Sequence, residues 1–136
     1  MICDWSIGDL PGLNKSESAQ LQQLGITTTR QLLQIAPDAA TKQQLAISLG
    51  TKIQYVNKLV ALADLSRLAG VGCQYNGLLL HTGIVSVRQL SQMPAHKLHQ
   101  QLLRLHVATL QRRDLCPDLA QVQSWIKQAM ELGSSE

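Results

Sequence analysis

The stretch LAGVG at residues 68–72 has the composition of a turn that binds an anion through backbone amides. Successive amides at a glycine-rich turn leading into a helix point into one concave, partly positive space, where an anion can accept several hydrogen bonds. Arginines before the turn and further along the chain could add positive charge there. The candidate phosphate-binding residues are Arg67, Gly70, Val71, Gly72, Arg112 and Arg113.

A second candidate is a row of basic residues on the helix expected within PAHKLHQQLLRLH, residues 94–106. Its leucines recur at positions i, i+4 and i+7, so they must face the core. Lys97, Gln100 and Arg104 then share the outer face, which we call the basic stripe. Such a face is ordinarily a solvated helix surface. Its functional interpretation is a surface that follows a nucleic-acid backbone and extends the contact of the turn.

The uneven distribution of charge is the strongest indication of function. Residues 65–113 contain six lysines and arginines, all four histidines and no Asp or Glu, which gives this segment a charge of +6. Residues 1–64 are balanced at zero, and residues 114–136 carry a charge of −3. A basic half of this kind indicates an anionic partner, either a nucleic-acid backbone or an acidic protein surface.

No pattern in the sequence indicates catalysis or a metal centre. The acids of the first half form no evident pair, and neither a Gly-x-Ser-x-Gly motif nor a P-loop is present. The three cysteines and four histidines fit no known zinc-ligand spacing. We therefore expect a protein that is not an enzyme, with no catalytic residue, no metal, no cofactor and no small-molecule substrate.

The composition predicts an all-α protein with a single domain, residues 1–136. Leu, Gln and Ala dominate, Phe is absent, and β-branched residues are too scattered for a sheet. No apolar run is long enough to span a membrane, and the N-terminal MICDWSIGDL lacks the pattern of a secretory signal. The odd number of cysteines, without CxxC spacing, argues against a disulfide framework. We expect a cytoplasmic protein without membrane contact.

The sequence matches itself when it is shifted by 58 residues. The segment at 10–32 lies over the segment at 68–90, and the match includes glycines, leucines and the triplet RQL. A shared period across such different residue types indicates two copies of one supersecondary unit. We expect repeat one at about 7–50, a buried linking helix at about 51–68, repeat two at about 65–113 and a C-terminal helix at about 118–132.

Each copy is predicted to be a pair of helices separated by a glycine. A helix of about ten residues ends at Gly25 or Gly83, because the left-handed conformation closes a helix there without a Cβ clash. The hydroxyls of Thr28 and Ser86 are then placed to cap the helices that follow. Asp118 is placed to cap the C-terminal helix in the same way.

This pattern resembles the helix-hairpin-helix motif, in which an apolar-Gly-apolar-Gly turn joins two helices. The second copy fits best, whereas the first has Asn14 where the second hairpin glycine belongs. Asn tolerates positive φ better than most residues, so the turn can be kept. The chain as a whole is similar to an uncharacterised family of small bacterial proteins, a domain of unknown function built from tandem hairpins of this kind.

Two functions remain open for this chain. The resemblance implies a non-catalytic helix-hairpin-helix module whose second hairpin and basic stripe hold the sugar-phosphate backbone of nucleic acid, independently of base sequence. The alternative is an adaptor in protein–protein interaction that uses the basic half to bind an acidic partner. The intact second hairpin favours the first function. The altered first hairpin and the absence of a Lys or Arg just after the second turn favour the adaptor.

Overall fold

The computed structural model describes residues 4–10, 13–110 and 117–135. Helices and the turns that join them make up this part of the chain. In these ranges there are eight α-helices, one 3-10 helix and no β-strand, so the all-α prediction is confirmed. None of these helices combines the length and apolar character that crossing a membrane requires. The elements are η1 (Ile7–Asp9), α1 (Lys15–Gln23), α2 (Thr29–Ile35), α3 (Ala39–Leu49), α4 (Ile53–Leu65), α5 (Gly72–His81), α6 (Val87–Ser91), α7 (Ala95–Leu110) and α8 (Leu119–Ser135).

The helix ends lie where the sequence predicts them. Gly25 and Gly83 have φ of 86° and 95°, and they follow the ends of α1 and α5. Thr28 Oγ1 accepts a hydrogen bond from the amide three residues on, at 3.2 Å, and Ser86 Oγ accepts the equivalent bond at 3.0 Å. These predictions are confirmed because each depends only on bonds between neighbouring residues.

The same backbone bonds recur 58 residues apart. The Ile26 amide donates to the Leu21 carbonyl at 2.9 Å, and the Ile84 amide donates to the Leu79 carbonyl at 3.0 Å. In both units this bond fixes the chain just after the glycine that ends the first helix. The superposition of the two whole units stays a prediction.

An aspartate from an earlier segment caps the short helix in each unit. Asp4 Oδ1 accepts a hydrogen bond from the Arg30 amide in the first turn of α2, at 3.1 Å. Asp64 Oδ2 accepts one from the Val87 amide at the start of α6, at 2.7 Å. A carboxylate at a helix N-terminus satisfies an amide that has no partner within the helix. The two units therefore share a long-range contact as well as local ones.

The segment before α1 differs at Asn14 from the hairpin that the sequence predicts. We expected Asn14 to keep the turn by tolerating positive φ, as Gly72 does with φ of 51°. Asn14 instead has φ of −87° and caps α1, accepting a hydrogen bond from the Glu17 amide at 2.8 Å. The expectation was wrong because an extended Asn satisfies a helix amide without left-handed strain. Gly12, the other glycine of this hairpin, lies outside the described residues.

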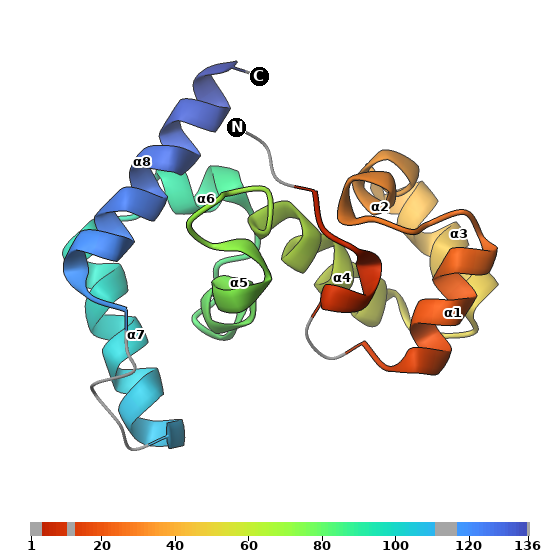
Figure 1. The fold of residues 1–136 in the computed structure, drawn as a ribbon, viewed down its shortest axis with the longest axis horizontal. Helices are drawn as coiled ribbons and strands as arrows, with labels where there is room; N and C mark the ends of the chain where they lie inside the picture. Colours follow the sequence, from red (N-terminus) through yellow and green to blue (C-terminus); the bar gives the residue numbers. More distant parts are fainter. Residues whose placement is uncertain (1–3, 11–12, 111–116, 136) are drawn as a thin grey trace.

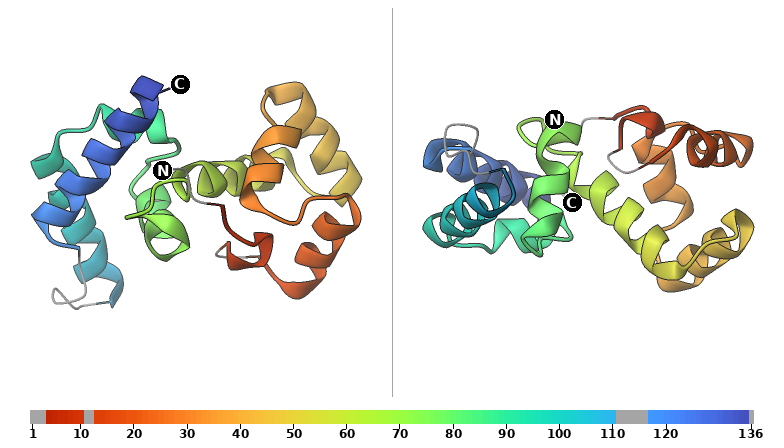
Figure 2. Two further views of the ribbon diagram at one scale, coloured as in Figure 1. Left: turned by 45° about the horizontal axis from the view of Figure 1, so that its top comes forward. Right: turned by 90° about the horizontal axis from the view of Figure 1, so that it is seen from below.

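Helix α4 runs between the two units (Figures 1 and 2). It contributes to two hydrophobic clusters. Its Val56, Leu59 and Leu62 pack in a cluster with residues of α1, α2 and α3. Leu65, at its end, packs in a second cluster with residues of α5 to α8. The linking helix expected at about 51–68 is therefore present, and it is buried on most of its sides.

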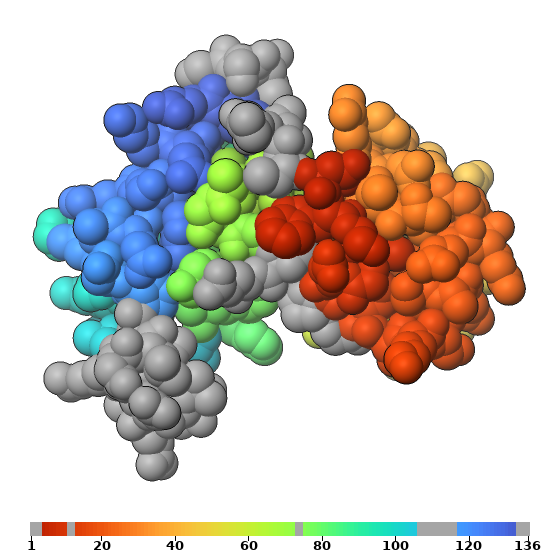
Figure 3. All heavy atoms as spheres, in the orientation of Figure 1, coloured from red at the N-terminus to blue at the C-terminus, as the bar shows by residue number. Residues whose placement is uncertain are grey.

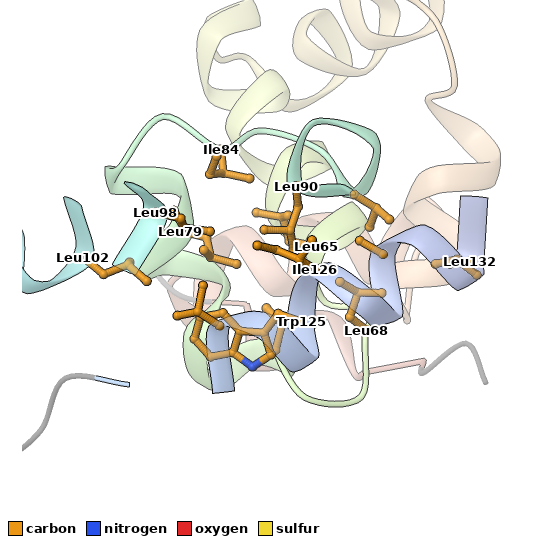
Figure 4. Packing of buried hydrophobic residues seen from close by; sticks show 14 residues of the cluster. Leu65, Leu68, Leu79, Ile84, Leu90, Leu98, Leu102, Trp125, Ile126 and Leu132 are labelled. Carbon is orange, nitrogen blue, oxygen red and sulfur yellow. The ribbon is translucent and has the colours of Figure 1, made fainter. Parts of the chain in front are cut away.

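Helix α8 completes the second cluster. Figure 4 shows Trp125 and Ile126 of α8 beside leucines that come from α4, α5, α6 and α7. The Trp125 side chain is 2% exposed, although it is the largest side chain of the cluster. Burying an aromatic side chain of this size contributes strongly to stability. The second unit therefore depends on a helix that follows it in the sequence.

The C-terminal helix departs from its prediction in two respects. Asp118 caps it as expected, accepting a hydrogen bond from the Gln121 amide at 2.8 Å. The helix continues to Ser135, beyond the predicted end near residue 132. Met130, which the periodicity placed on the buried face, is 53% exposed. Trp125 packs in the cluster, so the side of α8 that carries Trp125 is buried in place of the side that carries Met130.

Gly83→Val is expected to lower the free energy of unfolding by about 1 to 2 kcal/mol, because a β-branched residue is strained at φ of 95°. A Cβ at Gly83 would meet no atom within 4 Å, so this loss reports backbone strain. Chemical denaturation followed by circular dichroism measures it. The control is Gly8→Ala, whose Cβ would make an ordinary contact of 3.6 Å, and it should change stability by less than about 0.5 kcal/mol. Equal stability of the two variants would contradict the turn assignment.

Candidate functional site

The glycine turn at 68–72 joins α4 to α5, and its amides have partners inside the protein. The Val71 and Gly72 amides both donate to the Leu68 carbonyl, at 3.1 and 2.9 Å. The Gly70 amide donates to Gln128 Oε1 of α8 at 3.0 Å. An anion could bind the amides of Gly70, Val71 and Gly72 only by displacing these bonds, so the anion-binding nest at the turn stays a prediction.

Trp5 covers the turn from the N-terminal segment. Its indole Nε1 donates to the Ser66 carbonyl at 2.9 Å, and the Trp5 carbonyl accepts from the Thr29 amide of the first unit. A Cβ at Gly72 would lie 2.6 Å from Trp5 Cζ2, so only glycine fits against the indole. Figure 3 shows the N-terminal segment, in red, meeting the green residues around the start of α5. Trp5 therefore joins the first unit to the turn of the second.

Trp125 covers the same turn from α8. A Cβ at Gly70 would lie 3.0 Å from Trp125 Cδ1 and 3.1 Å from Gln128 Nε2. The Trp125 ring also packs on the Tyr75 ring, with their centroids 5.1 Å apart. The turn is thus enclosed by two tryptophans from opposite ends of the sequence, and it acts as a structural junction.

Arg67, predicted to add charge to the turn, is engaged by Asp64. Arg67 Nη2 lies 2.8 Å from Asp64 Oδ1, and the two side chains are 18% and 21% exposed. The other oxygen of Asp64 caps α6 at the Val87 amide. Arg67 thus compensates the charge of a carboxylate that the fold requires. Arg112 and Arg113 lie outside the described residues, and their role in binding stays a prediction.

The basic stripe has the arrangement that the sequence predicts. Lys97, Gln100 and Arg104 are exposed on α7, whereas Leu98 and Leu102 are fully buried. Among the described residues, neither Lys97 nor Arg104 has a side-chain hydrogen bond or an ion pair. Helix geometry separates these two cations by about two turns, roughly 10 Å. The stripe is therefore accessible to an anionic partner.

A groove along α4 is the feature that the sequence analysis missed. It has a volume of about 660 Å³ and is lined by residues of α2, α3, α4 and α5 and of the segment before α6. We call it the α4 groove. Its lining combines apolar side chains with Lys42, Lys58 and the Asp64–Arg67 pair. Only tertiary packing brings these segments together. The one local hint is the polar pair Asn57-Lys58 in a helix that is otherwise mostly apolar.

The structure describes only some of the cysteines and histidines that the sequence analysis considered as metal ligands. Across the ranges that the structure describes, no group of three or more His, Cys, Asp or Glu side chains could hold a metal ion. Cys3 and Cys116 lie outside these ranges. His81 and His96 are exposed side chains on α5 and α7.

Gly72→Ala is expected to lower the free energy of unfolding more than Gly83→Ala does. Both glycines have positive φ, but only at Gly72 would the added Cβ overlap another side chain, that of Trp5. Left-handed strain costs about 1 to 2 kcal/mol in either variant, and overpacking against Trp5 adds about 1 to 3 kcal/mol. Denaturant unfolding of both variants measures the difference. In the background of Trp5→Ala, the additional cost of Gly72→Ala should disappear, as a double-mutant cycle reports. Additive effects of the two substitutions would show that Trp5 does not close the turn.

Comparison with known proteins identifies the family of the chain. Residues 11–132 match the family described as Domain of unknown function (DUF4332). A comparison with curated proteins and one with solved structures gave no match. The matched residues include both units, the linking helix α4 and nearly all of α8. The chain therefore belongs to the DUF4332 family, a domain of unknown function.

Proposed function

We propose that the chain is a non-catalytic, cytoplasmic binding module that recognises an acidic surface of a partner protein through the basic stripe. The observation that carries this proposal is a contrast within the second unit. The turn amides at Gly70, Val71 and Gly72 donate inside the protein, whereas Lys97 and Arg104 are exposed and have no polar partner among the described residues.

The engaged turn disfavours recognition of phosphate by backbone amides. A phosphate at the turn would have to displace the Gln128 side chain and break two bonds to the Leu68 carbonyl. A buried polar group left without a partner costs about 1 to 3 kcal/mol, and these groups lie between two tryptophans. Recognition by exposed lysine and arginine side chains needs no such rearrangement. The stripe is therefore the better candidate for the binding surface.

The charge of the surrounding chain suits an acidic partner. Residues 65–113 contain no Asp or Glu, so no carboxylate within that stretch of sequence competes for the stripe. Complementary charge speeds encounter with a partner and suppresses binding to basic surfaces. Exposed ion pairs contribute only about 0.2 to 1 kcal/mol each. The stripe thus supplies orientation and specificity, and apolar contacts elsewhere must supply most of the affinity.

A nucleic-acid backbone is the second candidate, and the same lack of acids favours it. The two cations of the stripe can reach about two phosphates, and Arg88 is a further exposed cation on α6. The slope of the logarithm of the DNA-binding constant against the logarithm of salt concentration steepens by about 0.9 for each phosphate neutralised. Such a small number of contacts therefore gives weak binding that depends only moderately on salt. Without the turn amides, this candidate depends on the residues near Arg112 and Arg113.

Lys97→Ala together with Arg104→Ala is expected to weaken binding of a fluorescein-labelled oligoglutamate peptide by about fivefold, because two exposed charge pairs are lost. Fluorescence anisotropy at about 50 and 200 mM salt measures this change, with labelled duplex DNA and duplex RNA as competing ligands. The matched control is Lys52→Ala together with Lys127→Ala, which removes the same charge from two exposed positions outside the stripe. This control should change the affinity by less than about twofold.

Two results would overturn the proposal. Equal losses of peptide affinity in the stripe variant and its control would mean that binding depends only on the net charge of the chain. Tighter binding of duplex DNA than of oligoglutamate, reduced by Arg112→Ala together with Arg113→Ala, would establish the nucleic-acid function instead.

A further inference from the structure

The α4 groove is a second surface with the features of a binding site, and it lies apart from the basic stripe. Along α4 its lining extends from Asn57 to Asp64 and continues to Arg67. At about 1.5 Å per residue the part on α4 covers roughly 10 Å, or about two helical turns. A space of about 660 Å³ along such a length can take several side chains of an extended or helical segment.

The floor of the groove is apolar. Leu33 and Val60 are half-buried, and Leu80 of α5 lies among the same lining residues. Val85, just before α6, is 53% exposed although it is a large apolar side chain. Apolar side chains that remain accessible in a concave surface gain free energy when a partner covers them.

The remaining charge of the groove is positive. Asp64 is its one acidic lining residue, and both of its oxygens are engaged, one by Arg67 and one by the Val87 amide. Lys42 and Lys58 also line the groove, and neither has a side-chain hydrogen bond or ion pair within the described ranges. The charge of Lys42 also interacts with the Asp38 carboxylate, whereas no such interaction is present for Lys58 in the described ranges. Two ammonium groups beside an apolar floor complement a ligand that carries both carboxylates and apolar side chains.

We propose that the α4 groove docks an acidic amphipathic segment of a partner protein. Apolar side chains of that segment cover Val60, Leu80 and Val85, and its carboxylates pair with Lys42 and Lys58. This is the groove mode of recognition, in which apolar anchors at helical spacing give affinity and flanking charges give orientation. The proposal does not depend on the basic stripe, so either surface can fail its test without the other.

The groove favours a polypeptide segment over a small molecule because its lining follows α4 for about two turns, continues to Arg67 and comes from five segments of the chain. A compact ligand would use only part of this length. A second copy of the chain is an alternative occupant, since residues 114–136 carry a charge of −3. The oligomeric state separates that alternative from a partner protein.

The probe for the test is a fluorescein-labelled amphipathic peptide of Leu and Glu, with Glu on one helical face, added to the full-length chain. Lys42→Ala together with Lys58→Ala should weaken its binding by about fivefold through the loss of two charge pairs. Val85→Glu should weaken binding by at least about tenfold, because it places a carboxylate on the apolar floor at an exposed position that tolerates substitution. Circular dichroism checks that both variants fold.

The matched control is Lys52→Ala together with Lys127→Ala, which removes the same charge from two exposed positions outside the groove and the stripe and should change the affinity of this probe by less than about twofold. Amide shifts in the spectrum of the ¹⁵N-labelled chain should concentrate at Lys58, Val60, Leu80 and Val85. Absence of binding, or equal weakening by the groove variant and the Lys52/Lys127 control, would overturn the proposal. So would a chain that sediments as a dimer and becomes monomeric in the groove variants, because the occupant would then be a second copy.

Discussion

The close packing of the glycine turn at 68–72 between Trp5 and Trp125 is the constraint on which the second unit depends. Gly72 has no side chain because the Trp5 indole occupies that space, and Gly70 has none because α8 does. The Gln128 side chain and the Ser66 carbonyl add hydrogen bonds on the two sides. The turn thus fixes the N-terminal segment, α4 and α8 relative to one another, although they are far apart in sequence.

This constraint also decides which groups can bind a partner. Engaged amides cannot hold an anion without giving up their present bonds, so the accessible positive charge lies on lysine and arginine side chains. Helix α4 carries part of that charge, because Lys58 is exposed beside the groove although most sides of the helix are buried in the two clusters. This arrangement supports the proposed recognition of an acidic protein surface more directly than it supports binding of phosphate.

The sequence predicted those features that depend on neighbouring residues. The positive φ of Gly25 and Gly83 and the caps at Thr28 and Ser86 each follow from one local bond, and all are present. The exposed stripe followed from helical spacing alone. The closure of the turn could not be predicted in this way, since it depends on Trp5 and on residues of α8. The α4 groove was missed for the same reason, because five separate segments line it.

Amide hydrogen exchange at the glycine turn tests the central claim most directly. In the ¹⁵N-labelled chain, the amides of Gly70, Val71 and Gly72 should exchange at least about a hundredfold more slowly than in an unstructured peptide, because each donates inside the protein. In Gln128→Ala the Gly70 amide should lose most of its protection, while Val71 and Gly72 keep theirs. Exchange of all three amides at the rate of an unstructured peptide would contradict the account, because the turn would then be free to bind an anion.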